Sequence, residues 1–288
     1  MTVTSWIQLG LLSFALALAY YPQTGTVLAD IPHILAPRQT LSTKMPDSTV
    51  DPYCLRSNTQ VADGTLVDRL WKDNCELVEK FLRNTFVLAQ ARQDVKDPNG
   101  TFGSFQYYSV QDYYYLLATI PHKAFIMKTE LPVSMIDLRS AITANINSMS
   151  GSLEFADQFY RNLTDPEEID VPEIAVKNGS LRAAGLGYVQ WLQGNTDLGW
   201  FGYRGWSEIA HFLDSLQDTN KSSIFYRNWI SPNLDLSYGA KISKQLEAGK
   251  NLYVDNQTFP RYSQLFREAM QFEIAFFESA VGKTLSDV

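Results

Sequence analysis

The sequence predicts an all-α protein. Apolar residues recur at three- and four-residue steps through most of the chain, which is the spacing of a buried helix face. Sustained alternation of β-branched and polar residues is missing from the sequence, and it has no Gly-rich strand-turn-helix unit. With 288 residues, of which 45% are hydrophobic and 13% aromatic, the chain is long enough to bury a large core.

The first 29 residues are expected to be a signal peptide. An uncharged apolar run of about 14 residues (6–19) precedes Pro22 and a set of small residues that ends at Ala29. The run is shorter than the ~20 residues of a stable membrane span. The run lacks the Lys or Arg that normally precedes it in a signal peptide, and a retained anchor is the alternative. We therefore expect a secreted protein with no stable membrane span after signal removal.

Residues 30–60 are rich in Pro, Ser and Thr without periodicity, which predicts an extended or disordered leader. A single helical domain is expected over 61–288. The apolar stripes predict its helices over these ranges: 64–93, 104–121, 133–163 with a break near Gly151, 181–192, 200–216, 222–230, 236–252 and 262–281.

Local chemistry marks the helix boundaries. The Asp-Pro-Asn-Gly turn at 97–100 ends the first helix, and Pro121 ends the second. The acidic, Pro-containing stretch 165–179 is expected to be a surface connection, and Gly194 separates the next two helices.

Two features of the sequence agree with secretion. The only two cysteines, Cys54 and Cys75, are close enough to form a disulfide that would pin the N-terminal segment to the first helix. Two unpaired buried thiols are the alternative for a cytosolic protein. Five Asn-X-Ser/Thr sequons in loop-like stretches favour a glycoprotein. They are Asn99, Asn162, Asn178, Asn220 and Asn256.

Charge and histidine content limit the partners. The net charge of −7 and the absence of any basic run argue against nucleic acid, which needs clustered Lys and Arg. His211 follows Glu208 by three residues, but no second Glu-X-X-His completes a di-iron pattern. We therefore expect no metal and no cofactor, and a small molecule as the partner.

The most unusual stretch is 104–119. Phe105, Tyr108, Asp112, Tyr115 and Thr119 share one face of the predicted helix. An ionised Asp inside an aromatic face is costly unless something hydrogen-bonds it. Asp112 is therefore either a brace for a neighbouring helix or a ligand-binding group, and spacing alone slightly favours the brace.

The terminal helix repeats this anomaly. Glu273 falls within an apolar stripe formed by Phe266, Met270, Phe277 and Ala280. We expect Glu273 to be buried and desolvation to raise its pKa. Two helices that each bury a carboxylate among aromatic rings predict a shared acid–base site. The alternative is a buried polar network that only specifies packing.

Three segments resemble the TenA/thiaminase II family. The first is Gly100-Thr101-Phe102 followed by Phe-Gln-Tyr-Tyr-Ser-Val-Gln-Asp-Tyr-Tyr-Tyr-Leu at 105–116. The second is Tyr-Arg-Asn-Trp-Ile at 226–230, which is similar to the Tyr-X-X-Trp-Ile segment of the family. The third is Glu-Ile-Ala-Phe-Phe-Glu-Ser-Ala at 273–280, similar to the family's Glu-X-X-Phe-Trp-X-X-Ala ending with Phe277 for Trp.

The resemblance implies a haem-oxygenase-like helical bundle whose buried pocket binds an aminopyrimidine and hydrolyses its C–N bond. It implies that Asp112 binds the pyrimidine, that Tyr115 lines the pocket and that Glu273 is the catalytic acid–base group. Tyr108, Trp206 and Tyr226 complete the substrate-binding residues that we expect.

The chain departs from the family at the nucleophile. Gly202 stands about where the family has its catalytic Cys, and Trp206 stands where it has a Tyr. We therefore expect a diverged, secreted TenA-like enzyme that acts on a small, nitrogen-containing metabolite. The alternatives are a non-catalytic binding protein and a thiaminase II-type aminopyrimidine aminohydrolase. Family members commonly form tetramers, so a homo-oligomer is open to this chain unless glycans at Asn162 or Asn220 block the contacts.

Overall fold

In a computed structural model, the protein is described over residues 52–55, 61–93, 96–129, 135–194, 201–235 and 257–288, and at 240, 244 and 247. The expected signal peptide (1–29), most of the expected leader and helix 236–252, and the sequon at Asn256 lie outside the described residues. The described residues form helices, turns and loops without a strand, which confirms the all-α prediction.

The region predicted as one helix over 64–93 is three short helices, so that prediction is wrong. They are α2 (Leu66–Asp73), α3 (Cys75–Leu82) and α4 (Thr85–Arg92). An asparagine stands at each break. Asn74 donates its side-chain amide to the Leu70 carbonyl (2.7 Å), and Asn84 caps α4 by accepting from the Phe86 N–H (2.9 Å). Asn side chains that bind the backbone compete with helix continuation, and the apolar stripe does not register this effect.

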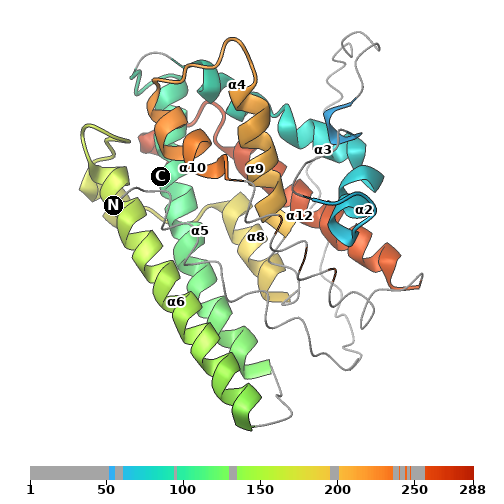
Figure 1. Cartoon of the computed structure of the whole chain (residues 1–288). Helices are drawn as coiled ribbons and strands as arrows, with labels where there is room; N and C mark the ends of the chain where they lie inside the picture. Colours follow the sequence, from blue (N-terminus) through green and yellow to red (C-terminus); the bar gives the residue numbers. More distant parts are fainter. Residues whose placement is uncertain are drawn as a thin grey trace.

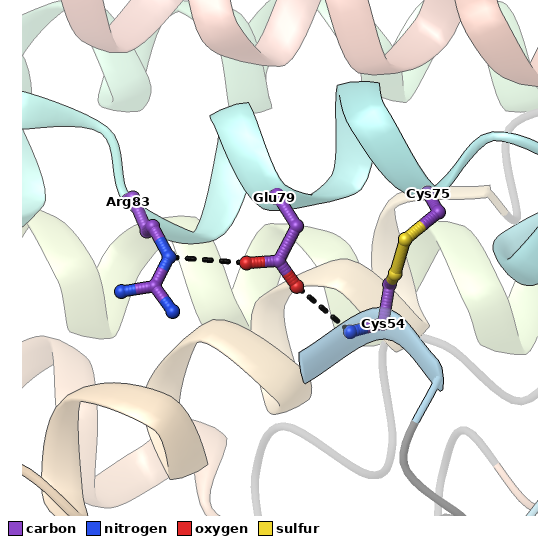
Figure 2. Close-up of a disulfide and its surroundings, with 4 residues drawn as sticks. All are labelled: Cys54, Cys75, Glu79 and Arg83. Atoms are coloured by element: carbon purple, nitrogen blue, oxygen red, sulfur yellow. Dashed lines mark hydrogen bonds and ion pairs between the residues drawn. A yellow bond between two sulfur atoms is a disulfide. The ribbon is translucent and has the colours of Figure 1, made fainter. Parts of the chain in front are cut away.

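A disulfide joins Cys54 to Cys75 and confirms the predicted bridge (Figure 2). Cys54 lies in the single turn η3 (Tyr53–Leu55), and its N–H donates to Glu79 of α3 (2.8 Å). Glu79 also accepts from Arg83 (3.0 Å). The described end of the expected leader is therefore a helical turn fixed to α3.

Helices α5 (Thr101–Thr129) and α6 (Met135–Thr164) lie side by side as a long antiparallel pair (Figure 1). The predicted stop at Pro121 is wrong, because α5 continues to Thr129. The predicted break at Gly151 is also wrong, because α6 is continuous. One Pro or Gly costs about 1–3 kcal/mol in a helix, and packing along a neighbouring helix can offset that amount.

The stretch 165–179 is only partly the surface connection that was expected. Ile169 and Val171 are completely buried, and Gln106 of α5 donates to the Ile169 carbonyl (3.1 Å). The stretch then forms the short helix α7 (Glu173–Asn178), which is followed by α8 (Ala183–Gly194).

The remaining described elements complete the bundle. They are α9 (Phe201–Asp214), the π-helical turn η4 (Tyr226–Ile230), α10 (Ser231–Asn233), α12 (Phe259–Ser279) and the turn η5 (Leu285–Asp287). Rings from three helices meet in the core. Phe86 of α4, Tyr108 of α5 and Phe277 of α12 have centroids 5.1–5.9 Å apart. Within the described residues, no helix is long and apolar enough to cross a membrane.

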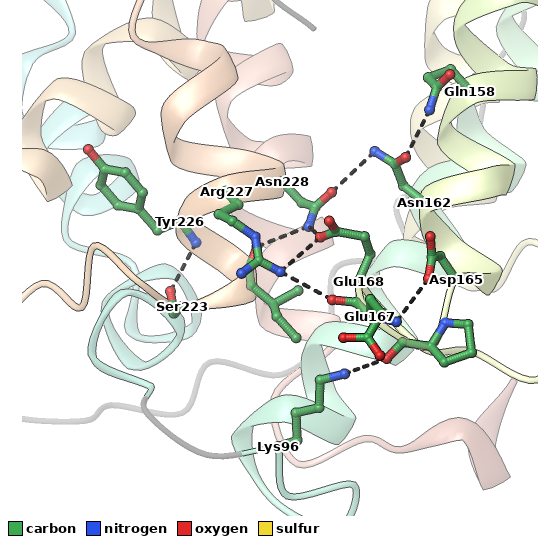
Figure 3. A network of polar contacts seen from close by, with 12 residues as sticks. Lys96, Gln158, Asn162, Asp165, Glu167, Glu168, Ser223, Tyr226, Arg227 and Asn228 are labelled. Carbon is green, nitrogen blue, oxygen red and sulfur yellow. Dashed lines mark hydrogen bonds and ion pairs between the residues drawn. The ribbon is translucent and has the colours of Figure 1, made fainter.

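Four sequons lie among the described residues, and they differ in environment. Asn99 and Asn178 are exposed. Asn162 lies in the last turn of α6 rather than in a loop, and its amide donates to Asn228 (3.2 Å; Figure 3). The amide of Asn220 donates to the Gln93 carbonyl (2.8 Å).

Candidate functional site

Glu273 of α12 is the centre of a buried polar cluster. Its side chain is almost fully enclosed, with 4% of the residue exposed, as the apolar stripe predicted. The Tyr188 hydroxyl of α8 donates to its Oε1 (2.9 Å), and the Trp206 indole N–H of α9 donates to its Oε2 (3.4 Å). Three helices therefore fix the orientation of one carboxyl group.

The environment of Glu273 makes it a weaker acid than a glutamate exposed to water. Burial raises the pKa of Glu273 from 4.5 to about 7, while the hydrogen bonds from Tyr188 and Trp206 oppose part of the rise. The sequence predicted that burial raises the pKa of Glu273, and the structure agrees with this direction. Near neutral pH the group populates both its protonated and its ionised form.

Asp112 of α5 is the second carboxyl group of the cluster. Burial raises the pKa of Asp112 from 3.8 to about 7, and the negative charge of Glu273 adds to the rise. Asp112 retains partial exposure, and no hydrogen bond to it is found among the described residues. The fold therefore brings the two carboxyl groups within electrostatic reach of each other, one held by donors and one not.

The two tyrosines of the α5 face occupy different parts of the cluster. Tyr108 lies in the core, and burial together with the charges of Asp112 and Glu273 raises its pKa well above 10. Tyr115 stacks on Tyr188 with centroids 5.1 Å apart. Tyr108 is therefore within electrostatic reach of both carboxyl groups, and Tyr115 packs on the tyrosine that binds Glu273.

Sequence reasoning missed Tyr188 and Trp229. Tyr188 donates to Glu273, and Trp229 makes a polar contact with the Tyr108 hydroxyl. Trp229 stands in the Tyr-X-X-Trp-Ile segment, but only Tyr226 of that segment was assigned to the site. Gly185 and Gly187 could have drawn attention to Tyr188, which lies on the same helix. Glycines within a helix often mark the place where another helix packs closely.

The structure places Tyr226 in a separate set of contacts. Its hydroxyl donates to Asp214 (2.7 Å), which raises its pKa to about 12, and Asp214 also pairs with Lys221 (2.7 Å). In Figure 3 the Tyr226 ring points away from the neighbouring network that Arg227 forms with Glu168. Tyr226 makes none of the hydrogen bonds or ring contacts described around Glu273.

Two features limit the chemistry of the cluster. Both cysteines of the chain are held in the disulfide, so neither is a free thiol. Among the described residues, no positively charged side chain acts on the pKa of Asp112 or Glu273. The cluster thus combines two weak acids with aromatic rings, which suits proton transfer and the binding of a planar or cationic group.

His211 and Glu208 are the pair that could have suggested a metal site, and both side chains have other partners. The His211 ring is hydrogen-bonded to the Leu234 carbonyl (2.7 Å), and Glu208 pairs with Arg204 (3.2 Å). No group of three or more potential metal ligands is present in the described part of the chain.

No family model and no curated protein sequence matches the chain. Solved structures do match it. A TenA homologue from P. horikoshii OT3 superposes with a TM-score of 0.58 at 18% identity and covers 75% of this chain and 98% of its own. A TenA homologue from Pyrococcus furiosus gives 0.55 at 18% identity, covering 75% and 99%.

A TenA family transcription regulator from Silicibacter sp. TM1040 gives a TM-score of 0.53 at 16% identity, covering 75% of this chain and 96% of its own. At these identities the likeness establishes a TenA-like fold. The fold expected from the three sequence segments is therefore confirmed.

Proposed function

We propose that the protein is a diverged TenA-like enzyme that acts on a small, nitrogen-containing metabolite through acid–base chemistry at Glu273. The observation that carries the proposal is the pair of carboxyl groups on α5 and α12, both with a pKa of about 7. Carboxyl groups whose pKa is raised by burial cluster at functional sites.

The two carboxyl groups suit different roles. Glu273 is oriented by Tyr188 and Trp206 and populates both protonation states near neutral pH, so it can give or take a proton at one fixed place. Asp112 has free acceptor capacity within the described residues and can accept a hydrogen bond from an N–H group of the ligand. Stacked rings such as Tyr115 and Tyr188 provide flat surfaces for a planar heterocycle.

Both cysteines are held in the disulfide, so the site has no thiol nucleophile. Two other functions are therefore considered: hydrolysis by water and ligand binding without turnover. Without a thiol nucleophile, the cluster either uses water or performs no chemistry. In a thiaminase II-type hydrolysis, water adds to the substrate carbon as the C–N bond breaks. Glu273 accepts the proton from water and returns it to the leaving amine. In a binding protein the same residues would hold the ligand without turnover.

Incubation with two compounds separates these functions. The purified protein is incubated with thiamin and with 4-amino-5-aminomethyl-2-methylpyrimidine, and products are followed by mass spectrometry. Hydrolysed product supports the aminohydrolase. Tight binding without product supports the binding protein. Our proposal predicts neither result and instead a different metabolite that co-purifies with the protein and is consumed by it.

Replacement of Glu273 tests the acid–base role. We expect Glu273→Gln to lower kcat by roughly a hundredfold or more while the helical circular dichroism stays unchanged, because Gln cannot transfer the proton. The matched control is Glu278→Gln on the same helix, where the native side chain is half exposed and pairs with Lys80. Equal turnover by Glu273→Gln and the control would refute the assigned role.

A further inference from the structure

Two exposed places in the chain carry the dipeptide Asn-Gly. Asn99 and Gly100 lie in the turn that precedes α5, and Asn178 and Gly179 lie at the end of α7. Both asparagine side chains are exposed. Asparagine is a chemically labile residue, and a following glycine increases its lability because glycine has no side chain to shield its nitrogen. The two places share one local chemistry, so they can be compared directly.

The reaction open to such a dipeptide is deamidation, and its only co-reactant is water. The glycine nitrogen loses its proton to the solvent and bonds to the Cγ atom of the asparagine. The side-chain amide takes up a proton and leaves as ammonia, so a succinimide ring forms. Water then adds to either ring carbonyl carbon and breaks the bond from that carbon to the ring nitrogen, which gives aspartate or isoaspartate. The asparagine must rotate about ψ before the nitrogen can reach Cγ.

The glycine N–H groups are bound alike at the two places. The N–H of Gly100 donates to the Asp97 carbonyl (3.1 Å), and the N–H of Gly179 donates to the Val176 carbonyl (3.3 Å). Each bond closes a single turn of backbone, so neither nitrogen is better shielded than the other by its hydrogen bond. A difference in reactivity therefore depends on how firmly the surrounding backbone is held.

The backbone that follows Asn178 is held by its neighbours. Asn178 is the last residue of α7, so its ψ lies in the helical range. A Cβ on Gly179 would lie 2.7 Å from Val288 and 3.0 Å from the Tyr114 ring, so no free space exists beside this glycine. The Tyr114 hydroxyl also donates to the Val176 carbonyl (2.5 Å). Rotation at Asn178 would displace these packed groups, which is costly in a close-packed structure.

The backbone around Asn99 is less constrained. Asp97, Pro98 and Asn99 are all exposed, and Asn99 lies in a turn rather than in a helix. The atoms closest to a Cβ on Gly100 all belong to the Asp97 side chain, the nearest at 2.5 Å. That side chain accepts from the Asn99 N–H (3.0 Å) and is itself exposed, so it can move aside. Exposed loop tips of this kind tolerate local rearrangement.

We propose that Asn99 is a site of spontaneous deamidation and that Asn178, in the same dipeptide, is protected by the packing of Gly179. The aspartate product adds a carboxylate just before the first turn of α5, where the helix dipole favours negative charge. The isoaspartate product lengthens the main chain and disturbs the bond from the Gly103 N–H to the Asp97 carbonyl (3.0 Å). Either product lacks the side-chain nitrogen that a glycan would need, so deamidation prevents later glycosylation at Asn99.

Peptide mass spectrometry of aged protein tests the proposal. The full chain is made in a bacterial periplasm, where disulfides form, and is incubated in mildly alkaline buffer without glycans on either asparagine. The peptide with Asn99 should gain about 1 Da and become a substrate of protein isoaspartate methyltransferase, at least roughly tenfold faster than the peptide with Asn178. Equal rates, faster reaction at Asn178 or no reaction at Asn99 would overturn the proposal.

Two further measurements separate the dipeptide from its packing. In protein unfolded by urea and dithiothreitol, Asn99 and Asn178 should deamidate at similar rates, because the contacts of Gly179 are lost. An Asn178 that stays unreactive in the unfolded chain would show that packing is not what protects it. In the folded protein, Gly100→Ala should slow the reaction at Asn99 severalfold, since a Cβ shields the attacking nitrogen. An unchanged rate in this variant would exclude attack by that nitrogen.

Discussion

At the scale of single residues, Asp112 and Glu273 have similar pKa values but differ in their hydrogen bonding. Desolvation is the main cause of the raised pKa in both. Tyr188 and Trp206 hold the Glu273 carboxyl in one orientation, while Asp112 keeps its acceptor positions open within the described residues. This difference suits a fixed proton-transfer group beside an adaptable ligand-binding group.

A buried carboxyl group with a raised pKa destabilises the folded state at neutral pH. Below about pH 3 both states hold the Asp112 proton, and no penalty exists. As the pH rises towards 7, the unfolded chain releases the proton first, so the free energy of unfolding falls. Above pH 7 the penalty is constant.

Replacement of Asp112 should therefore stabilise the protein. We expect Asp112→Asn to raise the free energy of unfolding by on the order of 4 kcal/mol at pH 8 and by less than about 1 kcal/mol at pH 4. Urea unfolding at both pH values measures the difference. Asp157→Asn, at an exposed carboxylate on α6, is the control and should show no such gain. A stability loss in Asp112→Asn at pH 8 would instead indicate a structural brace.

At the scale of elements, the packing of α8 on α12 builds the site. A Cβ on Gly185 would lie 2.5 Å from the Leu181 side chain and 3.0 Å from the Phe276 ring of α12, so the glycine lets α12 pack closely here. Gly187, on the same helix, has an ordinary 3.6 Å distance to Phe272. Close packing at Gly185 brings Tyr188 within hydrogen-bond distance of Glu273.

Alanine substitutions at the two glycines should have different effects. Gly187→Ala should stabilise the protein by up to about 1 kcal/mol, because Ala favours the helix and meets no close neighbour. Gly185→Ala should be less stable than Gly187→Ala by about 1 kcal/mol, since the Leu181 side chain must shift and the Phe276 ring must also give way. Thermal unfolding of the two variants measures the difference, and equal stabilisation by both would contradict this account.

At the scale of the whole molecule, one core joins the described helices, and the disulfide attaches the N-terminal turn η3 to it. Tyr53 of that turn packs edge-on against Phe212 of α9 (5.4 Å). Cys54 and Cys75 are 21 positions apart, so the bridge closes a short loop around α2. A bridge of this kind favours an oxidising compartment.

Removal of the disulfide should destabilise the protein. Cys54→Ala combined with Cys75→Ala should lower the free energy of unfolding by about 3 kcal/mol, the loop-entropy value for this separation. Urea unfolding with and without dithiothreitol measures the effect. The native protein should lose the same amount on reduction, whereas the double variant should not respond. Equal stability of all forms would contradict a stabilising bridge.

We further propose that the protein passes through the secretory pathway, and the sequons test this proposal. Glycans are expected at the exposed Asn99 and Asn178 in protein made by eukaryotic secretory cells. Mature protein should lack them at Asn162 and Asn220, whose amides are engaged in hydrogen bonds of the fold. Glycopeptide mass spectrometry measures occupancy at each position. Full occupancy at Asn220, or none at Asn99 and Asn178, would contradict the proposal.

The sequence by itself determined the helical class and the burial of Glu273. These properties depend on the spacing of residues within one segment, which is visible before folding. The breaks at Asn74 and Asn84 depend on side-chain hydrogen bonds to the backbone, and the spacing of apolar residues does not record them.

Only the tertiary structure decided which side chains complete the site. It brought Tyr188, which was not expected at the site, to Glu273 beside the expected Trp206, and it turned Tyr226 towards Asp214. These contacts depend on how closely helices far apart in the sequence approach one another, and on the rotation of each helix about its axis. A pattern within one helix specifies its buried face, but not the residue that another helix places against that face.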